Sequence, residues 1–285
     1  MQPGFNPEGE LRKVRDMSTF GARLHAAVED RGPLCAGIDP HASLLTAWGL
    51  NDDVAGLERF ALTAVEGLAP HVSVIKPQSA FYERFGSRGI AVLERVIAES
   101  RAAGALVLLD VKRGDIGSTS QAYADAYLDP ASPLASDAIT VSPYLGFGSL
   151  APFIASAVEY DAGLFVLGLT SNPEGPEVQR STTDTGETVA ARMFAHLATL
   201  NAGAEPMGSF GAVVGATIGD AAADLAFNGP ILAPGFGEQG GTAADIKRIF
   251  GDLPVLPSSS RGLLKVGPDG AALRDVALRT NAELR

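Results

Sequence analysis

Short apolar runs recur along the chain and alternate with stretches of helical periodicity. The runs are continuous and rich in Val, Ile and Leu, which is typical of parallel strands buried on both faces. Eight of them are present: Leu34–Ile38, Val72–Ile75, Leu106–Val111, Ala138–Val141, Leu164–Leu169, Gly211–Gly215, Ile231–Ala233 and Leu253–Leu256.

The segments between these runs indicate amphipathic helices. In Val54–Leu68 the apolar residues follow the i, i+3, i+4 spacing of a helix with one buried face. Alternating strand and helix units predict an α/β protein with a parallel sheet, and eight units predict a closed (β/α)8 TIM barrel. A doubly wound open sheet is the alternative, but no glycine-rich dinucleotide turn follows the first run.

Two regions interrupt this alternation. Residues 1–17 precede the first helix and are interpreted as an N-terminal arm. Residues 172–210 form a long link between the fifth and sixth strands; its first part, 172–188, is polar and turn-rich, and its second part, Val189–Leu200, is predicted to be the helix. Because no linker divides the remainder, residues 18–285 are predicted to form a single barrel domain.

The composition narrows the cellular setting and the class of partner. The net charge of −11 argues against nucleic acid, whose phosphates need a basic surface. The single cysteine, Cys35, rules out an intramolecular disulfide, and the four histidines lack metal-ligand spacing. No apolar run reaches the roughly 18 residues of a membrane span, and residues 1–17 lack the apolar segment of a signal peptide. We therefore expect a cytoplasmic protein with no membrane partner and no metal.

Charged side chains stand where the first three strands are predicted to end, which is the end at which a barrel enzyme builds its active site. Asp39 follows the first run, Lys76 follows the second, and Asp110 and Lys112 lie in the third. Asp110 and Lys112 are two residues apart on a strand, so both are expected to point into the barrel. Burying these charges is costly, and such a network is more typical of an active site than of a structural ion pair.

The last two strands are followed by residues suited to binding phosphate. The loop PGFGEQGG, 234–241, has four glycines that let its backbone approach an anion closely. The segment SSSRG, 258–262, adds the guanidinium of Arg261, which can grip a phosphate with two hydrogen bonds. Barrels often bind phosphate after strands seven and eight, so the sequence predicts a phosphorylated substrate.

These motifs together resemble the orotidine 5′-phosphate decarboxylase family. The segment DVKRGDIGST, 110–119, carries a D-x-K-x-x-D core. The supporting segments GIDP, IKPQ, LTSNP, APGFGEQGG and SSSRG lie along the chain in the order typical of that family. The match spans residues 34 to 262, and the segment IKPQSAFYERFG resembles the longer bacterial branch. The resemblance implies a homodimer with shared active sites that converts orotidine 5′-phosphate (OMP) to UMP and CO₂ in pyrimidine biosynthesis.

The resemblance also implies roles for individual residues. Lys112 would protonate C6 of the pyrimidine, and Asp110 would lie against the substrate carboxylate, with Lys76 linking it to the ribose. The other expected site residues are Asp39 on a ribose hydroxyl, Asp115 and Thr119 reaching into the partner's site, Ser171 on the pyrimidine, and Gln239, Arg261, Pro234, Gly235 and Gly262 around the phosphate.

The predicted charge network suits a decarboxylation without a cofactor. Loss of CO₂ from C6 leaves an electron pair on a carbon that has no π system to accept it, and most decarboxylases use a cofactor as the electron sink. The sequence shows no site for one. Fixed cations can instead stabilise the carbanion, and Lys112 can protonate it.

Four other functions are compatible with parts of the sequence. A Mg²⁺-dependent 3-keto-gulonate 6-phosphate decarboxylase shares the D-x-K-x-x-D pattern but needs an acidic ligand near strand two, where this chain has Lys76. A Schiff-base aldolase needs a lysine away from carboxylates, whereas Lys112 lies beside Asp110. A non-catalytic nucleotide-binding barrel or a purely structural barrel would have no use for the charge network.

Overall fold

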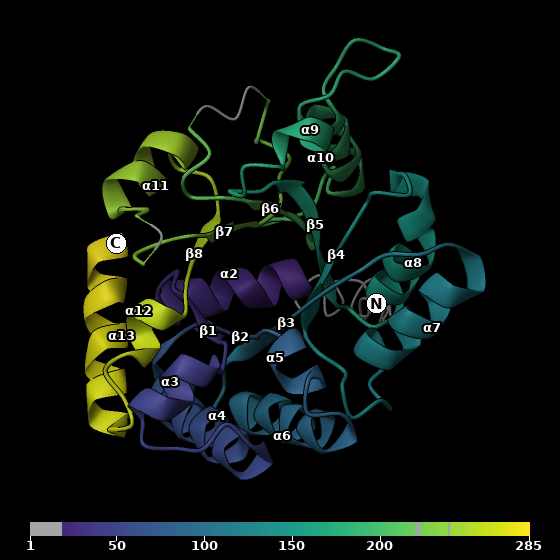
Figure 1. Ribbon diagram of the computed structural model, residues 1–285. Helices are drawn as coiled ribbons and strands as arrows, with labels where there is room; N and C mark the ends of the chain where they lie inside the picture. Colours follow the sequence, from purple (N-terminus) through teal and green to yellow (C-terminus); the bar gives the residue numbers. More distant parts are fainter. Residues whose placement is uncertain (1–18, 220–222, 239) are drawn as a thin grey trace, which may run out of the picture.

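A closed barrel of eight parallel strands forms the centre of the molecule (Figure 1), in a computed structural model that describes residues 19–219, 223–238 and 240–285. Each strand pairs with its neighbours in chain order, and β1 closes the ring on β8. The predicted TIM barrel is therefore confirmed. The strands are β1 (Cys35–Ile38), β2 (Val74–Pro77), β3 (Leu106–Arg113), β4 (Ala138–Val141), β5 (Gly163–Leu169), β6 (Phe210–Val214), β7 (Ile231–Pro234) and β8 (Val255–Ser259).

Helices surround the barrel, and α2 lies across the middle of the ring in Figure 1. None of the described helices is long and apolar enough to span a membrane. The helices are α2 (Phe20–Arg31), α3 (Ala42–Ala47), α4 (Val54–Leu68), α5 (Ala80–Glu83), α6 (Ser87–Ala102), α7 (Gly117–Leu128), α8 (Ala151–Glu159), α9 (Pro176–Gln179), α10 (Val189–Leu200), α11 (Ala243–Phe250), α12 (Arg261–Leu264) and α13 (Gly270–Leu284), with short 3-10 turns η1 (Ala69–His71) and η2 (Phe147–Leu150).

Helix α4 shows why the spacing of apolar residues predicts the bounds of a helix on the outside of the barrel. Asp53 caps its start by accepting a hydrogen bond from the backbone N–H of Gly56, 2.8 Å away. Its apolar stripe is buried from Leu57 and Phe60 to Leu68, and Val54 at its start is partly buried. The helix packs between α6 and α13, and its bounds are those predicted from the sequence.

The inside of the barrel is built in layers because alternate residues of a strand face inward. One apolar layer takes a residue from every strand: Cys35, Val74, Leu108, Ala138, Phe165, Val213, Leu232 and Leu256. Phe20 of α2 closes the amino-terminal end below this layer, edge-on to Phe165 at 6.1 Å. Two residues further along each strand, toward the carboxyl ends, the layer includes the buried polar side chains of Lys76, Asp110, Thr140 and Ser258.

The structure departs from the sequence-based expectation by one or two residues at most strand ends, and further at β8 and after β6. Strand β8 begins and ends later than the predicted run Leu253–Leu256, because the buried serines at 258 and 259 continue the strand where an apolar search stops. Strand β2 likewise runs on through Lys76 and Pro77. No helix follows β6 in the described residues 215–219 and 223–230, so the expected strand–helix alternation is wrong there.

The polar link after β5 is an ordered excursion. It contains the short helix α9 and an isolated antiparallel bridge between Thr182 and Thr188, and it projects beyond the barrel at the top of Figure 1. Gln179 ties α9 back to the end of β5 through two hydrogen bonds with Thr170, of 2.9 and 2.7 Å. The proposed N-terminal arm, 1–17, lies outside the described residues.

We expect Asn201→Ala to lower the free energy of unfolding by about 2–3 kcal/mol. The buried Asn201 amide donates to the carbonyls of Phe210 and Phe227, at 2.8 and 3.0 Å, and accepts from the N–H of Phe210 at 3.2 Å. Removing it leaves these buried groups without partners. Denaturant unfolding measures the change, with the exposed Asn51→Ala as control; equal stability of the two variants would contradict the assignment.

Candidate active site

The carboxylate of Asp110 is the centre of the polar layer and accepts four hydrogen bonds. Lys76 and Gln78 donate to Oδ2, each at 2.9 Å. Lys112 and Thr140 donate to Oδ1, at 2.6 and 2.8 Å. Three adjacent strands, β2, β3 and β4, or the residues directly after them, supply all five side chains. The structure thus brings Lys76, Asp110 and Lys112 together as the sequence predicted.

Burial and charge act against each other at this centre. The side chains of Lys76 and Asp110 are only 7% and 6% exposed. Burial alone would raise the pKa of Asp110, but the charges of Lys76 and Lys112 outweigh it and hold that pKa well below its ordinary value. Burial would lower the pKa of Lys76, but Asp110 and Asp39 outweigh it and raise that pKa. Both groups are therefore charged at neutral pH.

Lys112 reaches Asp110 by a route that regular strand geometry does not provide. The pairing of β3 with β4 shifts register between Leu109 and Arg113, and Lys112 has φ of 43°. Its side chain is 46% exposed, so the expectation that it is buried inside the barrel is wrong. This register shift is a β-bulge, and it places the Lys112 ammonium where the centre opens to solvent. Asp110 holds the ammonium on one side, and the other side is accessible to a substrate.

Asp39 lies directly after β1 and is half-buried. Its atom Oδ1 is buried and has no hydrogen-bond partner among the described residues. A buried carboxylate oxygen without a donor is unfavourable, so this oxygen is suited to accept a hydrogen bond from a bound hydroxyl.

Gln78 and Thr140 both hydrogen-bond Asp110, and neither was predicted as a site residue from the sequence. Each had a signal. Gln78 follows Lys76 by two residues and so shares its side of the strand. Thr140 is the single polar residue of β4, in a strand whose other members are Ala, Ile and Val.

The residues expected to hold phosphate lie after β7 and β8. Gly235 has φ of 96°, which favours glycine at this turn. The amides of Gly237 and Gly241 donate to carbonyls of the same loop, at 2.8 and 3.1 Å, so these amides are not free for an anion as the sequence suggested. Arg261 is exposed and forms no ion pair within the described part of the chain. Pro234 and Gly262 flank the same region, and Gln239 lies outside the described residues.

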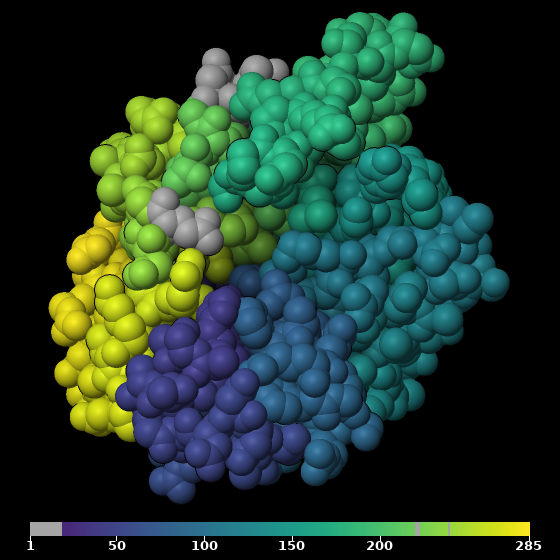
Figure 2. Space-filling view, viewed as in Figure 1, coloured from purple at the N-terminus to yellow at the C-terminus, as the bar shows by residue number. Residues whose placement is uncertain are grey.

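Three predicted site residues form no hydrogen bond or ion pair with the Asp110 centre in the part of the chain that the structure describes. Asp115 lies two residues before α7 and Thr119 in its first turn, and the Asp115 carboxylate accepts a hydrogen bond from the N–H of Ile116 at 2.8 Å. Ser171 is exposed just beyond β5. Figure 2 shows this face of the molecule hollowed near its centre, between the segments that follow the strands.

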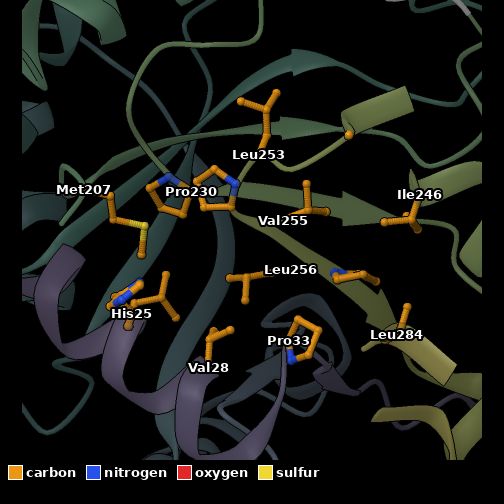
Figure 3. Close-up of a pocket in the computed structure, with 14 residues that line it drawn as sticks. His25, Val28, Pro33, Met207, Pro230, Ile246, Leu253, Val255, Leu256 and Leu284 are labelled. Carbon is orange, nitrogen blue, oxygen red and sulfur yellow. The ribbon is translucent and has the colours of Figure 1, made fainter. Parts of the chain in front are cut away.

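A second hollow, of about 230 Å³, lies at the opposite end of the barrel between α2, α11 and the start of β8 (Figure 3). Its lining is apolar, with His25 the one titratable side chain among the described residues that form it. The charges that chemistry requires are concentrated at the other end, around Asp110.

Comparison with known proteins identifies the family. A sequence profile described as the orotidine 5′-phosphate decarboxylase / HUMPS family matches residues 32–275. The chain belongs to this family. The resemblance found in the motifs is therefore confirmed, and the match extends to both sides of them.

Relatives within the orotidine 5′-phosphate decarboxylase / HUMPS family are similar over nearly the whole chain. The orotidine 5′-phosphate decarboxylase of Nocardioides sp. is 71% identical over 273 residues, covering 94% of this chain and 100% of that protein. A solved structure from Streptomyces avermitilis is 64% identical with a TM-score of 0.92, covering 94% of this chain and 95% of that one. The orotidine 5′-phosphate decarboxylase of Leishmania donovani is 29% identical with a TM-score of 0.69, covering 93% and 98%.

We expect Asp110→Asn to change how stability depends on pH. Because the pKa of Asp110 is depressed in the folded chain, its charge stabilises the fold above the unfolded pKa of about 3.9. That contribution begins to fall as pH drops toward this value, at up to about 1.4 kcal/mol per pH unit, and is lost completely only at the lower pKa of the folded chain. The difference in unfolding free energy between wild type and variant should therefore stay constant above about pH 5 and shrink from there toward pH 3 in denaturant titrations. A difference independent of pH would contradict the assigned pKa direction.

Proposed function

We propose that this chain decarboxylates OMP to UMP and CO₂ in pyrimidine biosynthesis, without a cofactor. The observation that carries the proposal is the Asp110 carboxylate held between two lysines at the carboxyl end of the barrel. The names of relatives as similar as that of Nocardioides support the substrate.

Lys112 has the proposed role of proton donor. When CO₂ leaves C6, the developing carbanion needs a fixed positive charge close by and then a proton. The Lys112 ammonium supplies both, because Asp110 anchors it at 2.6 Å while its side chain stays half-exposed toward the site. Asp110 in turn lies against the substrate carboxylate in this arrangement, and its charge favours release of that group, a form of ground-state effect.

The remaining contacts are proposed from the positions of the side chains. The unpartnered Oδ1 of Asp39 accepts a ribose hydroxyl, and Lys76 joins Asp110 to the ribose. Ser171 hydrogen-bonds the pyrimidine. Arg261 grips the phosphate, together with Gln239 and the backbone around Pro234, Gly235 and Gly262. The energy of the phosphate contacts, remote from C6, is available to the transition state.

The Mg²⁺-dependent sugar-phosphate decarboxylase remains the rival within the same family. The contacts of Lys76 disfavour it, because this ammonium occupies the end of β2 and bonds Asp110 where that chemistry needs another acidic ligand. A chelator separates the two functions.

The test is the loss of OMP ultraviolet absorbance in the presence of EDTA. We expect rapid turnover that EDTA does not change. No turnover of OMP by folded protein, with or without Mg²⁺, would overturn the proposal. Turnover of 3-keto-gulonate 6-phosphate that requires Mg²⁺ would establish the rival.

We also propose that the chain acts as a homodimer whose sites share residues. Asp115 and Thr119 follow the carboxyl end of β3, yet no hydrogen bond or ion pair joins them to the Asp110 centre of their own protomer within the described residues. The large apolar side chain of Ile116, next to Asp115 in the chain, is 63% exposed, and those of Tyr144 and Leu145 are 76% and 55% exposed. Tyr144 and Leu145 follow Ser142, whose backbone N–H donates to the carbonyl of Arg113 at 2.8 Å. An exposed apolar patch of this kind is typical of a protein interface.

We also propose a cytoplasmic location and no nucleic-acid partner. The net charge is −11. Cys35 is buried at the amino-terminal end of the barrel, and burial raises its pKa to about 12, so the thiol is inert and no disulfide stabilises the described chain.

A further inference from the structure

The buried hydroxyl of Thr140 forms hydrogen bonds with two residues of β3 at once. Its Oγ1 donates a hydrogen bond to Oδ1 of Asp110 at 2.8 Å and accepts one from the backbone N–H of Lys112 at 2.9 Å. Thr140 is 1% exposed and faces into the barrel from β4. One atom therefore fixes both the carboxylate that holds the Lys112 ammonium and the backbone that carries it.

The backbone of Lys112 needs such a contact. With φ of 43° it lies in the left-handed region, which is unfavourable for residues other than glycine and persists only where surrounding contacts impose it. The ladder between β3 and β4 is interrupted there, so the oxygen of a side chain, rather than a strand carbonyl, accepts the Lys112 N–H. Without that acceptor, the bulge of β3 at Lys112 would lose a hydrogen bond that stabilises it.

We propose that Thr140 is a positioning residue for the decarboxylation: its hydroxyl locks the bulge of β3 so that the Lys112 ammonium stays against Asp110 and aimed into the site. Thr140 does not touch the reacting atoms; it acts through Lys112 and Asp110. The inference rests on the proposed function, because it assigns Thr140 a task in that reaction.

The alternative is that the Thr140 hydroxyl makes these hydrogen bonds only because a buried hydroxyl needs partners, with no effect on the position of Lys112. Two substitutions separate the readings. Thr140→Val keeps the shape and removes both hydrogen bonds, while Thr140→Ser keeps the hydroxyl and removes a methyl group. Ser73→Ala is the control, because it removes a fully buried hydroxyl at the opposite end of the barrel, just before β2.

The experiment measures kcat and KM for OMP, and the dissociation constant of UMP, for the wild type and these three variants. We expect Thr140→Val to lower kcat about 10- to 100-fold, because a catalytic group displaced by about 1 Å loses rate on this scale. KM and UMP binding should change less than about threefold, since they depend on contacts elsewhere. Thr140→Ser should recover most of the lost turnover, and Ser73→Ala should leave kcat unchanged.

A Thr140→Val enzyme with kcat within twofold of the wild type, or equal losses in Thr140→Val and Thr140→Ser, would overturn the proposal. So would failure of both Thr140 variants to fold, because the intact threonine side chain, hydroxyl and methyl together, would then serve the fold. If the wild type does not act on OMP, the proposed function fails on its own. Crystal structures of wild type and Thr140→Val then decide the positioning role: Lys112 keeping a positive φ and its contact with Asp110 in the variant would overturn it.

Discussion

Lys112→Ala is expected to fold normally and to lose turnover of OMP by about 10⁴-fold or more. The substitution removes the cation next to the carbanion and the proton that quenches it, and each effect is worth about 10²-fold or more in enzymes. The fold should survive because the Lys112 side chain is 46% exposed. Asp110 keeps its hydrogen bonds from Lys76, Gln78 and Thr140.

The measurement is the absorbance assay in EDTA, with circular dichroism and UMP binding to verify that the variant is folded and its site formed. Lys247→Ala is the matched control, because Lys247 is an exposed lysine on α11. Turnover of Lys112→Ala within tenfold of the wild type would remove Lys112 as the proton donor and leave Lys76, the other ammonium on Asp110, as the group to test.

The barrel was predictable because strands buried on both faces must be apolar along their length, and few other folds repeat such runs eight times. The same logic failed where an inward-facing residue is small and polar. Ser258 faces inward and continues β8 because a serine is small enough for the crowded interior, and the buried Ser259 beside it ends the strand. The apolar runs did not indicate that a helix is lacking after β6 in the described part of the chain, because they locate the strands and not the form of the segments that connect them outside the barrel.

The sequence indicated which charged residues form the centre around Asp110, but not the geometry in which they meet. The spacing of Asp110 and Lys112 correctly placed them together, but it assumed a regular strand. The actual contact depends on a bulge and a positive φ at Lys112, which no propensity of lysine indicates. Thr140 was not predicted because its hydrogen bonds depend on the pairing of β4 with β3, which the sequence alone does not show.

The layering of the barrel explains why this centre can be so highly charged. Directly below Lys76 and Asp110 lies the apolar layer that includes Val74 and Leu108, which excludes water and gives the charges no other partners. A cation and an anion held in such surroundings interact more strongly than in water and need no reorganisation when the substrate arrives. The ion pair is weak as a source of stability, so its value is in the chemistry.

Mixing two inactive variants is expected to restore activity if the sites are shared. Lys112→Ala lacks the proton donor, and Asp115→Asn lacks the carboxylate proposed to reach the partner's site, with a loss of about 100-fold or more for the latter. In a dimer of one chain of each kind, one site combines Lys112 with the partner's Asp115 and is complete, while the other carries both defects. Random exchange makes half of the dimers mixed, so about a quarter of the wild-type turnover should return.

The control replaces Asp115→Asn by Lys76→Ala. Lys76 and Lys112 bond the same Asp110 within one protomer, so every dimer of these two variants has one defect in each site and no activity should return. Recovery with Asp115→Asn but not with Lys76→Ala would assign Asp115 to the partner's site. No recovery in either mixture, with exchange of subunits verified by labelled chains, would mean that Asp115 serves its own protomer, and the patch of Ile116, Tyr144 and Leu145 would then have to be explained without a shared site.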